Sequence, residues 1–452
     1  MKNSFVFILI ILFNISLYSQ SNENSTNFKI SINLEQALDL AVENDKTLKQ
    51  AEYDVRIAQT QKDASFSDLF LPSLTVSGGL NLSEPKEYQY NDFNTGVYSS
   101  ADTWSAQATL SKTLFTGFRN WNTDKAREIN LKMMKETYFD ERKNVAINTQ
   151  LNFYNTFVAQ ENYKVYYQQQ LNYSNRMRES YIKYRNGQVS EYEYLNAKVQ
   201  YESTKPQLVA LSNNYESLKL TFIRQIGLTN VTDEVELVGN ILDATKIALP
   251  DLDINVILDL IMANNIELSN MASNIEMLEY NRKVARSYLW PTFSANANVG
   301  ITTIDKLKLD NNKDFYKDRS GEFSWGVGFS LNYALDSLLP FSSTAKAAEE
   351  IQLSIEQMEI SYEQLRDNIE INSRNLISTA KSQELTLQSQ AENARTAAYA
   401  LQVAQRQYRG GTISTLELSD AELTYLNAQL SYLQAIYEYF SSTLQVLKLL
   451  GA

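Results

Sequence analysis

YRNGQVSEYEYLNA, residues 184–197, returns as YRGGTISTLELSDA at residues 408–421, an offset of 408 − 184 = 224. Upstream, residues 34–48 align with residues 254–268 at an offset of 254 − 34 = 220. A third match lies between them, at Pro72 and Pro291 (291 − 72 = 219). Matches in one order at nearly one offset indicate a duplicated unit of about 220 residues, far longer than the roughly 20–50 residues of a solenoid repeat. The sequence therefore predicts a pseudo-symmetric protein made of two similar halves.

Histidine and cysteine are absent from all 452 residues. Their absence excludes imidazole bases, thiol nucleophiles, disulfides and His or Cys metal sites, while carboxylate, Ser/Thr or Lys chemistry stays open. A formal charge of −12 argues against nucleic acid or an anionic membrane surface as a partner. With only 14 glycines and 6 prolines, the chain favours very long helices. We expect no catalytic residue, bound metal or cofactor.

The N-terminus reads as an export signal. Lys2 precedes an apolar run, Phe5–Leu17, which is followed by small and polar residues. This pattern predicts a secretory signal peptide over residues 1–20, cut near Ser19–Ser21. The alternative is a membrane anchor, for which the run of 13 residues is short because spanning needs about 20.

Each half contains one predicted hairpin, at residues 73–114 and 292–335. Apolar residues alternate with small or polar ones over 73–83, 104–111, 292–302 and 323–335, which predicts strands of about ten residues joined by polar loops at 84–102 and 303–322. Such alternation is typical of transmembrane barrel strands, and also of half-buried strands in a soluble sandwich. The export signal and the small polar face favour the barrel. Aromatic residues, which favour membrane interfaces, gather at the strand bases: Phe66, Phe70, Phe115, Phe118, Trp121, Tyr288, Trp290, Phe293 and Phe341.

Long helices account for the rest of each half. Residues 118–185 and 342–409 contain neither Pro nor Gly, so each predicts a helix of about 100 Å. Shorter helices of about 55 Å are predicted at 34–70, with a possible break near Asn44–Asp45, and at 190–226, 254–290 and 414–450. Each long helix can therefore pair with two shorter ones. We expect Pro206 to kink or break its helix. The predicted repeats span 21–226 and 254–452, joined by a connection at 227–253.

Four strands cannot close a barrel, and an open sheet edge in lipid leaves backbone groups without hydrogen bonds, each costing several kcal/mol. Closure therefore requires several copies. Two copies would give 8 strands and a filled interior, whereas three would give 12. Because the inner face is small and polar, we expect a lumen and three or more copies.

The chain resembles the TolC family of outer-membrane efflux and type I secretion channels. The resemblance rests on the duplicated halves, the strand openings LPSL (71–74) and WPTF (290–293), LSKTLFTGF (110–118) before a long helix, and the two tip motifs. It implies a mainly α protein with a membrane β-barrel: a homotrimer with a 12-stranded barrel in outer-membrane lipid and a long periplasmic helical tunnel. It also implies that the tunnel tip meets a periplasmic adaptor, which connects to an inner-membrane transporter.

The two tip motifs predict capped helical turns. Gly187 and Gly411 suit a left-handed residue at a helix C-terminus. Ser190 with Glu193, and Ser414 with Glu417, are spaced as capping boxes. The resemblance implies that these turns dock the adaptor, with Val189 and Ile413 as exposed apolar contacts. The alternative is that they are only well-capped turns.

The resemblance also implies a pore gate. Glu417 and Asp420 match the family's constricting carboxylates, and three residues apart on one helix they share a face. Such a ring of carboxylates would favour cations. Glu193 and Tyr408 match a hydrogen-bonded pair that helps to close the tip, while Ile413 replaces an arginine of that latch. The alternatives are a helix cap for both glutamates and a solvated helix face for Asp420.

The sequence thus predicts a passive exit duct in a tripartite efflux pump or type I secretion system, not an enzyme. Two other interpretations are a periplasmic coiled-coil scaffold, which would lack strands, and an exported hydrolase that uses carboxylates.

Overall fold

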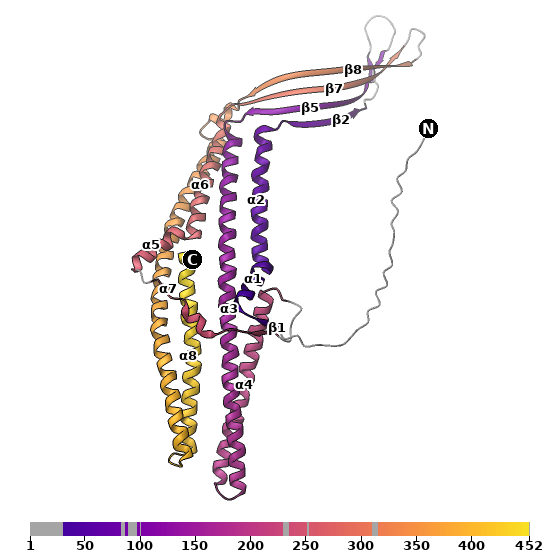
Figure 1. Ribbon diagram of the computed structural model, residues 1–452. Coiled ribbons are helices and arrows are strands. Elements are labelled where there is room, and N and C mark those ends of the chain that lie inside the picture. The colour runs from indigo at the N-terminus through magenta and orange to yellow at the C-terminus, as the bar shows by residue number, and fades with distance from the viewer. Residues whose placement is uncertain are drawn as a thin grey trace.

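The computed structural model describes residues 30–82, 86–88, 97–99, 101–228, 235–250, 253–309 and 315–451. The predicted signal peptide at 1–20 lies outside them. Figure 1 shows an elongated molecule, with a four-stranded sheet at one end and long helices running away from it. None of the described helices holds an apolar stretch long enough to cross a membrane.

The first half follows the predicted order. Its elements are β1 (Ile30–Ile32), α1 (Leu34–Asn44), α2 (Lys46–Phe70), β2 (Ser73–Asn81), β3 (Lys86–Tyr88), β4 (Val97–Ser99), β5 (Ala101–Phe115), α3 (Arg119–Arg185) and α4 (Glu191–Gln225). The break near Asn44–Asp45 is present because Asp45 caps α2, its carboxylate accepting from the Leu48 N–H at 2.9 Å.

The second half repeats this order after a short connection. The connection contains β6 (Val235–Leu237) and η1 (Ile241–Lys246). The elements of the second half are α5 (Ile254–Asn264), α6 (Ile266–Arg286), η2 (Ser287–Leu289), β7 (Thr292–Leu309), β8 (Phe315–Asn332), η3 (Leu335–Leu338), α7 (Ser343–Arg409) and α8 (Thr415–Leu450). The unbroken helix predicted over 254–290 is wrong. Asn265 interrupts it and caps α6, accepting from the Leu268 N–H at 3.0 Å, as Asp45 does in the first half.

Pro206 does not break its helix, because α4 is continuous from Glu191 to Gln225 with the proline inside. A proline removes one backbone donor and disturbs the preceding turn. In that turn the Ser203 hydroxyl donates to the Gln200 carbonyl at 2.8 Å, and the Thr204 hydroxyl donates to the Tyr201 carbonyl at 2.6 Å. These side chains supply hydrogen bonds just before the proline.

The sheet is antiparallel with strand order β2-β5-β7-β8. Three of its strands are longer than predicted: β5 contains 15 residues, and β7 and β8 contain 18 each, so most of the expected loop at 303–322 is strand. Backbone pairing continues through charged positions, where Asp305 is opposite Arg319 and Lys306 opposite Asp318. Pairing between strands needs only backbone groups. The strands can therefore extend beyond the residues whose apolar alternation set the predicted ends.

The two faces of the sheet differ as the alternation predicts. Apolar side chains on one face are exposed; Val76 is 77% and Trp325 74% exposed. On the other face Asn298 is opposite Gly326, and a Cβ at that glycine would come within 3.0 Å of the Asn298 amide oxygen. Within the described residues, the sheet therefore presents an uncovered apolar face and a close-fitting polar one.

Each long helix pairs with two shorter ones, as predicted. α3 contacts α2 and α4, and α7 contacts α6 and α8. The halves meet where α3 also contacts α6 and α8. The lateral order is thus α2-α3-α6-α7 near the sheet and α4-α3-α8-α7 toward the tips (Figure 1).

Two apolar cores lie at mid-length, where the short helices of each half meet. One joins α1, α3, α4, α8, β1 and β6 around residues such as Phe153, Phe222 and Phe440. The other joins α5, α6, α7 and α8 around Ile261 and Ile377. Full burial of one such side chain contributes about 1.5–3 kcal/mol, so these cores hold the coils together at their centre.

Gly227 ends α4 beside the first core, and we predict that it does not tolerate a side chain. Its φ is +82°, and a Cβ would lie 2.4 Å from the Asn44 Cβ. Gly227→Ala should lower the free energy of unfolding by about 2–4 kcal/mol, through left-handed strain and overpacking. Thermal unfolding followed by circular dichroism measures this effect. The matched control is Gly239→Ala, whose Cβ would meet Phe153 at an ordinary 3.8 Å; equal losses in both variants would contradict the prediction.

Candidate functional site at the helical tips

The two tips share one backbone design. After α3, the Gln188 N–H bonds the Lys183 carbonyl at 2.9 Å and the Gly187 N–H bonds the Tyr184 carbonyl at 2.9 Å. After α7, Thr412 and Gly411 repeat both bonds at 3.0 Å. Gly187 and Gly411 have φ values of +68° and +72°. Both ends are therefore Schellman motifs that require glycine, as the sequence predicts.

The return helices are capped differently. The Ser414 hydroxyl accepts from the Glu417 N–H at 3.2 Å, and the Glu417 carboxylate accepts from the Ser414 N–H at 2.7 Å. This is a complete capping box. Ser190 likewise accepts from the Glu193 N–H, at 3.3 Å, but α4 has no returning bond from Glu193. The capping box predicted for the first tip is therefore only half formed.

The Glu193 carboxylate is directed at the other tip instead. It accepts from the Thr415 hydroxyl at 3.1 Å, and that hydroxyl also lies 3.5 Å from the Tyr408 hydroxyl. Glu193 and Tyr408, which the sequence pairs, are thus brought together through Thr415. The same region holds Lys183, whose pKa is raised chiefly by the Glu179 carboxylate at 2.7 Å and also by Tyr408 and Glu193. Four helices, α3, α4, α7 and α8, contribute to this tip cluster of Glu179, Lys183, Glu193, Tyr408 and Thr415.

An open groove of about 700 Å³ runs between the tips. Six of the ten residues predicted for the gate and the docking tips line it: Ser190, Glu193, Tyr408, Gly411, Ile413 and Ser414. Val189 and Ile413 are half-buried rather than exposed as predicted. Larger apolar side chains of the same groove are more exposed, Tyr192 at 78% and Leu416 at 57%.

Glu417 and Asp420 lie on the exposed face of α8 and do not join the tip cluster. Hydrogen bonds from the Ser414 N–H and hydroxyl hold the pKa of Glu417 below its usual value. The carboxylate of Glu417 therefore stays ionised while it caps its own helix. Asp420, one turn further on, carries the charge that is directed away from the coil.

Sequence reasoning missed Thr415 and Lys183. A signal for Thr415 is present in the duplication: at the offset of 224 its counterpart is Glu191. The hydroxyl that bridges the tips is therefore a departure from the repeat. Lys183 gives no such signal, because its role depends on how the coils pack.

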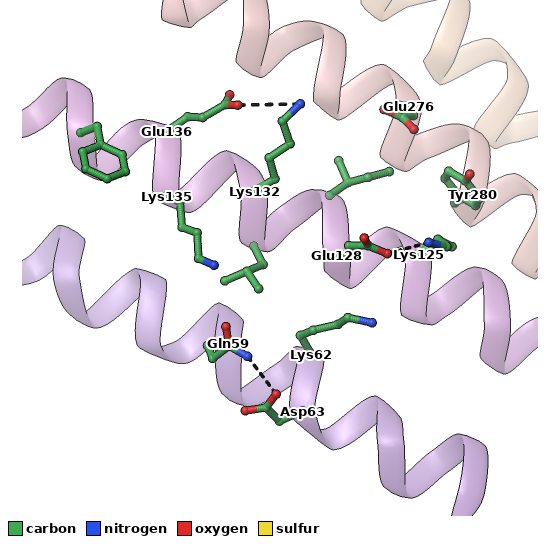
Figure 2. Close-up of a pocket in the computed structure, with 13 residues that line it drawn as sticks. Gln59, Lys62, Asp63, Lys125, Glu128, Lys132, Lys135, Glu136, Glu276 and Tyr280 are labelled. Atoms are coloured by element: carbon green, nitrogen blue, oxygen red, sulfur yellow. Dashed lines mark hydrogen bonds and ion pairs between the residues drawn. The ribbon is translucent and has the colours of Figure 1, made fainter.

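A second groove, of about 820 Å³, lies between α2, α3 and α6 near the sheet (Figure 2). Five of its eight charged side chains form ion pairs: Lys125 with Glu128 at 2.7 Å and Lys132 with Glu136 at 3.8 Å along α3, and Lys62 of α2 with Asp124 of α3 at 2.5 Å. Because these charges neutralise one another locally, we assign no ligand to this groove. Among the described residues no cluster of three or more Asp and Glu side chains is arranged to hold a metal ion.

An uncovered apolar sheet continued by coils of about 100 Å defines a subunit of an outer-membrane channel. The family model for outer membrane efflux proteins matches residues 37–227 and 257–452. The chain therefore belongs to the outer membrane efflux protein family. The two matched segments correspond to the two halves of the duplication. None of the curated proteins matches this chain.

Solved outer-membrane channels share the fold. The Campylobacter jejuni CmeC channel superposes with a TM-score of 0.73 at 20% identity, covering 92% of this chain and 85% of that one. VceC of Vibrio cholerae gives 0.70 at 14% identity, covering 93% and 96%. The open state of Neisseria gonorrhoeae MtrE gives 0.70 at 16% identity, covering 93% and 89%. With the family match, the predicted mainly α fold with a barrel part and the outer-membrane location are confirmed, and the scaffold without strands is excluded.

The Thr415 bridge predicts how the tips are held together. Thr415→Val removes the hydroxyl but keeps the side-chain volume, so Glu193 loses its donor from the other coil. We expect the tips to separate or fluctuate more widely. Because the chain has no cysteine, Glu191→Cys and Arg409→Cys can carry spin labels, and pulsed electron spin resonance reports the distance between them. Thr424→Val is the control, since that hydroxyl bonds only within α8, at 2.7 Å to the Asp420 carbonyl. An unchanged distance distribution in Thr415→Val would count against the bridge.

Proposed function

We propose that this efflux protein is a passive exit duct built from three copies of the chain, and that its tip gate selects for cations. The observation that carries the proposal is that the same two sides of the chain lack neighbours at every level. The sheet ends in β2 and β8, the upper helices end in α2 and α7, and the lower helices end in α4 and α7.

Unpaired sheet edges are the strongest part of this argument. In hydrocarbon, each backbone group without a hydrogen bond costs several kcal/mol. If β8 of one copy pairs with β2 of the next, the contact is heterologous and a ring must close. Four strands per chain give closure at 8 or 12, and the small polar inner face supports 12 with an open lumen.

The partners follow from the position of the tips. They lie at the end of the molecule furthest from the sheet (Figure 1). In an outer-membrane protein this end projects into the periplasm, where an adaptor could bind the turns at Gly187, Val189, Ser190, Gly411, Ile413 and Ser414. The adaptor would connect the duct to an inner-membrane transporter, which supplies the energy. We assign no catalytic role to any residue.

The copy number can be measured directly. Native mass spectrometry of the protein in mild detergent should give a mass of three chains, because only a closed ring pairs every sheet edge. Deleting β2, residues 73–81, removes one edge and should abolish the oligomer. A stable single chain in detergent, or a two-chain species, would contradict the proposal.

Asp420 and Glu417 should control ion selectivity. Asp420→Ala with Glu417→Ala should lower the preference for cations and the block by multivalent cations in planar-bilayer recordings, because six carboxylates leave the ring of a trimer (2 × 3 = 6). Since hydrogen bonds from Ser414 lower the pKa of Glu417, the contribution of Glu417 to wild-type selectivity should persist on acidification through the usual titration range of a glutamate carboxyl and be lost only at lower pH. Glu128→Ala, in the groove near the sheet, is the control and should leave selectivity unchanged. Wild-type selectivity in the double variant would exclude these residues from the constriction.

A further inference from the structure

One buried ion pair joins the two halves of the chain close to the tips. Arg176 on α3 contacts Glu422 on α8 through Nη2 and Oε1, and the two side chains are only 14% and 8% exposed. The other ion pairs between described residues stay within one half or within the connection between the halves. The pair therefore crosses the contact between the α3–α4 coil and the α7–α8 coil.

Its surroundings exclude water. On α8, Glu422 belongs to a buried face that also contains Leu418, Ser419 and Leu426. On α3, the guanidinium lies 5.8 Å from the ring centre of Tyr173, which is itself 8% exposed. Arg176 Nη1 and Glu422 Oε2 have no hydrogen-bond partner in the protein. At this buried position each ion offsets the desolvation cost of the other. Without its partner, the remaining ion would keep that cost uncompensated.

The pair also fixes how α8 is rotated. Successive residues of an α-helix are about 100° apart, so Glu422 lies about 200° around the helix from Asp420. Glu422 is buried against α3, whereas Asp420 and Glu417 are exposed on the opposite side. A rotation of α8 that moves Asp420 would therefore separate Glu422 from Arg176.

We propose that Arg176 and Glu422 are positioning residues of the tip gate, which hold α8 against α3 and so set where Asp420 points. This inference rests on the proposed channel function. The pair acts on the gate through the helix and does not contact the permeating ions. It differs from the tip cluster, whose residues are more exposed and lie at the ends of the coils.

The energetics of buried pairs make the proposal testable. Removing one partner leaves an isolated charge between the coils, and that charge is relieved only if the coils separate and admit water. Removing both partners with apolar side chains of similar volume leaves no charge to solvate, and the contact can stay closed. The effects of the two single substitutions should therefore cancel in the double variant rather than add.

The experiment compares Arg176→Met, Glu422→Leu and the double variant in planar bilayers. Each single variant should raise the fraction of time in the high-conductance state by about tenfold or more. The double variant should return to within about twofold of the wild type. The control is Glu128→Leu, which removes an exposed partner of Lys125 on the same helix α3 and should change nothing. Oligomer content in the outer membrane is measured for every variant, and Glu422→Gln replaces a single variant that fails to assemble.

Two results would overturn the inference. In one, the single variants show wild-type gating; in the other, the double variant is as open as the singles, which would mean that lost packing rather than an uncompensated charge opens the gate. Both leave the proposed function intact, because the wild type still conducts. A wild type that forms no channel at all would instead overturn the proposed function, and this inference with it.

Discussion

The hydrogen-bonding requirement of backbone groups at the sheet edges governs the design of this protein. β5 and β7 are paired on both sides, while β2 and β8 are each paired on one side only. Water can satisfy such an edge, but hydrocarbon cannot. The exposed apolar face of the sheet, with Trp325 74% exposed, suits lipid. A chain that places this sheet in a membrane must therefore obtain its missing hydrogen bonds from other copies.

The duplication allows the sheet edges to pair with other copies while the long helices of the same copies form a continuous wall. The halves meet at the centre of the chain, through β5 and β7 in the sheet and through α3 with α6 and α8 below it. Elements of the first half therefore form one flank and elements of the second half the other, at every level. A single contact between copies could then run without interruption from sheet to tip. The mid-length cores around Phe440 and Ile377 fix the coils relative to one another along this height.

Much of this architecture could be predicted from the sequence, because it depends on local signals. The four helix ends at the tips fall within one residue of the predicted ones, since glycine and serine caps mark them. The strand starts at Ser73 and Thr292 were predicted. The ends of β7 and β8 far from the helices could not be predicted, because the ladder continues past the point where alternation stops, as at Asp305. The break at Asn265 was missed, although Asp45 marks the matching position. Arg176 and Glu422 could not be paired at all, since their contact depends on how α3 and α8 pack.

The two tips show how a duplicated protein can acquire a mechanism that neither copy had alone. Glu193 and Glu417 occupy the same position of the repeat, yet only Glu417 completes a capping box. The capping of the two helices differs because of Thr415, whose counterpart in the first half is Glu191. A threonine hydroxyl can donate a hydrogen bond to Glu193, whereas a carboxylate at that position would repel it. One substitution thus directs Glu193 from its own helix cap to the neighbouring coil. Equivalent halves supply the symmetric wall, and divergence at a few tip positions supplies contacts between the two coils.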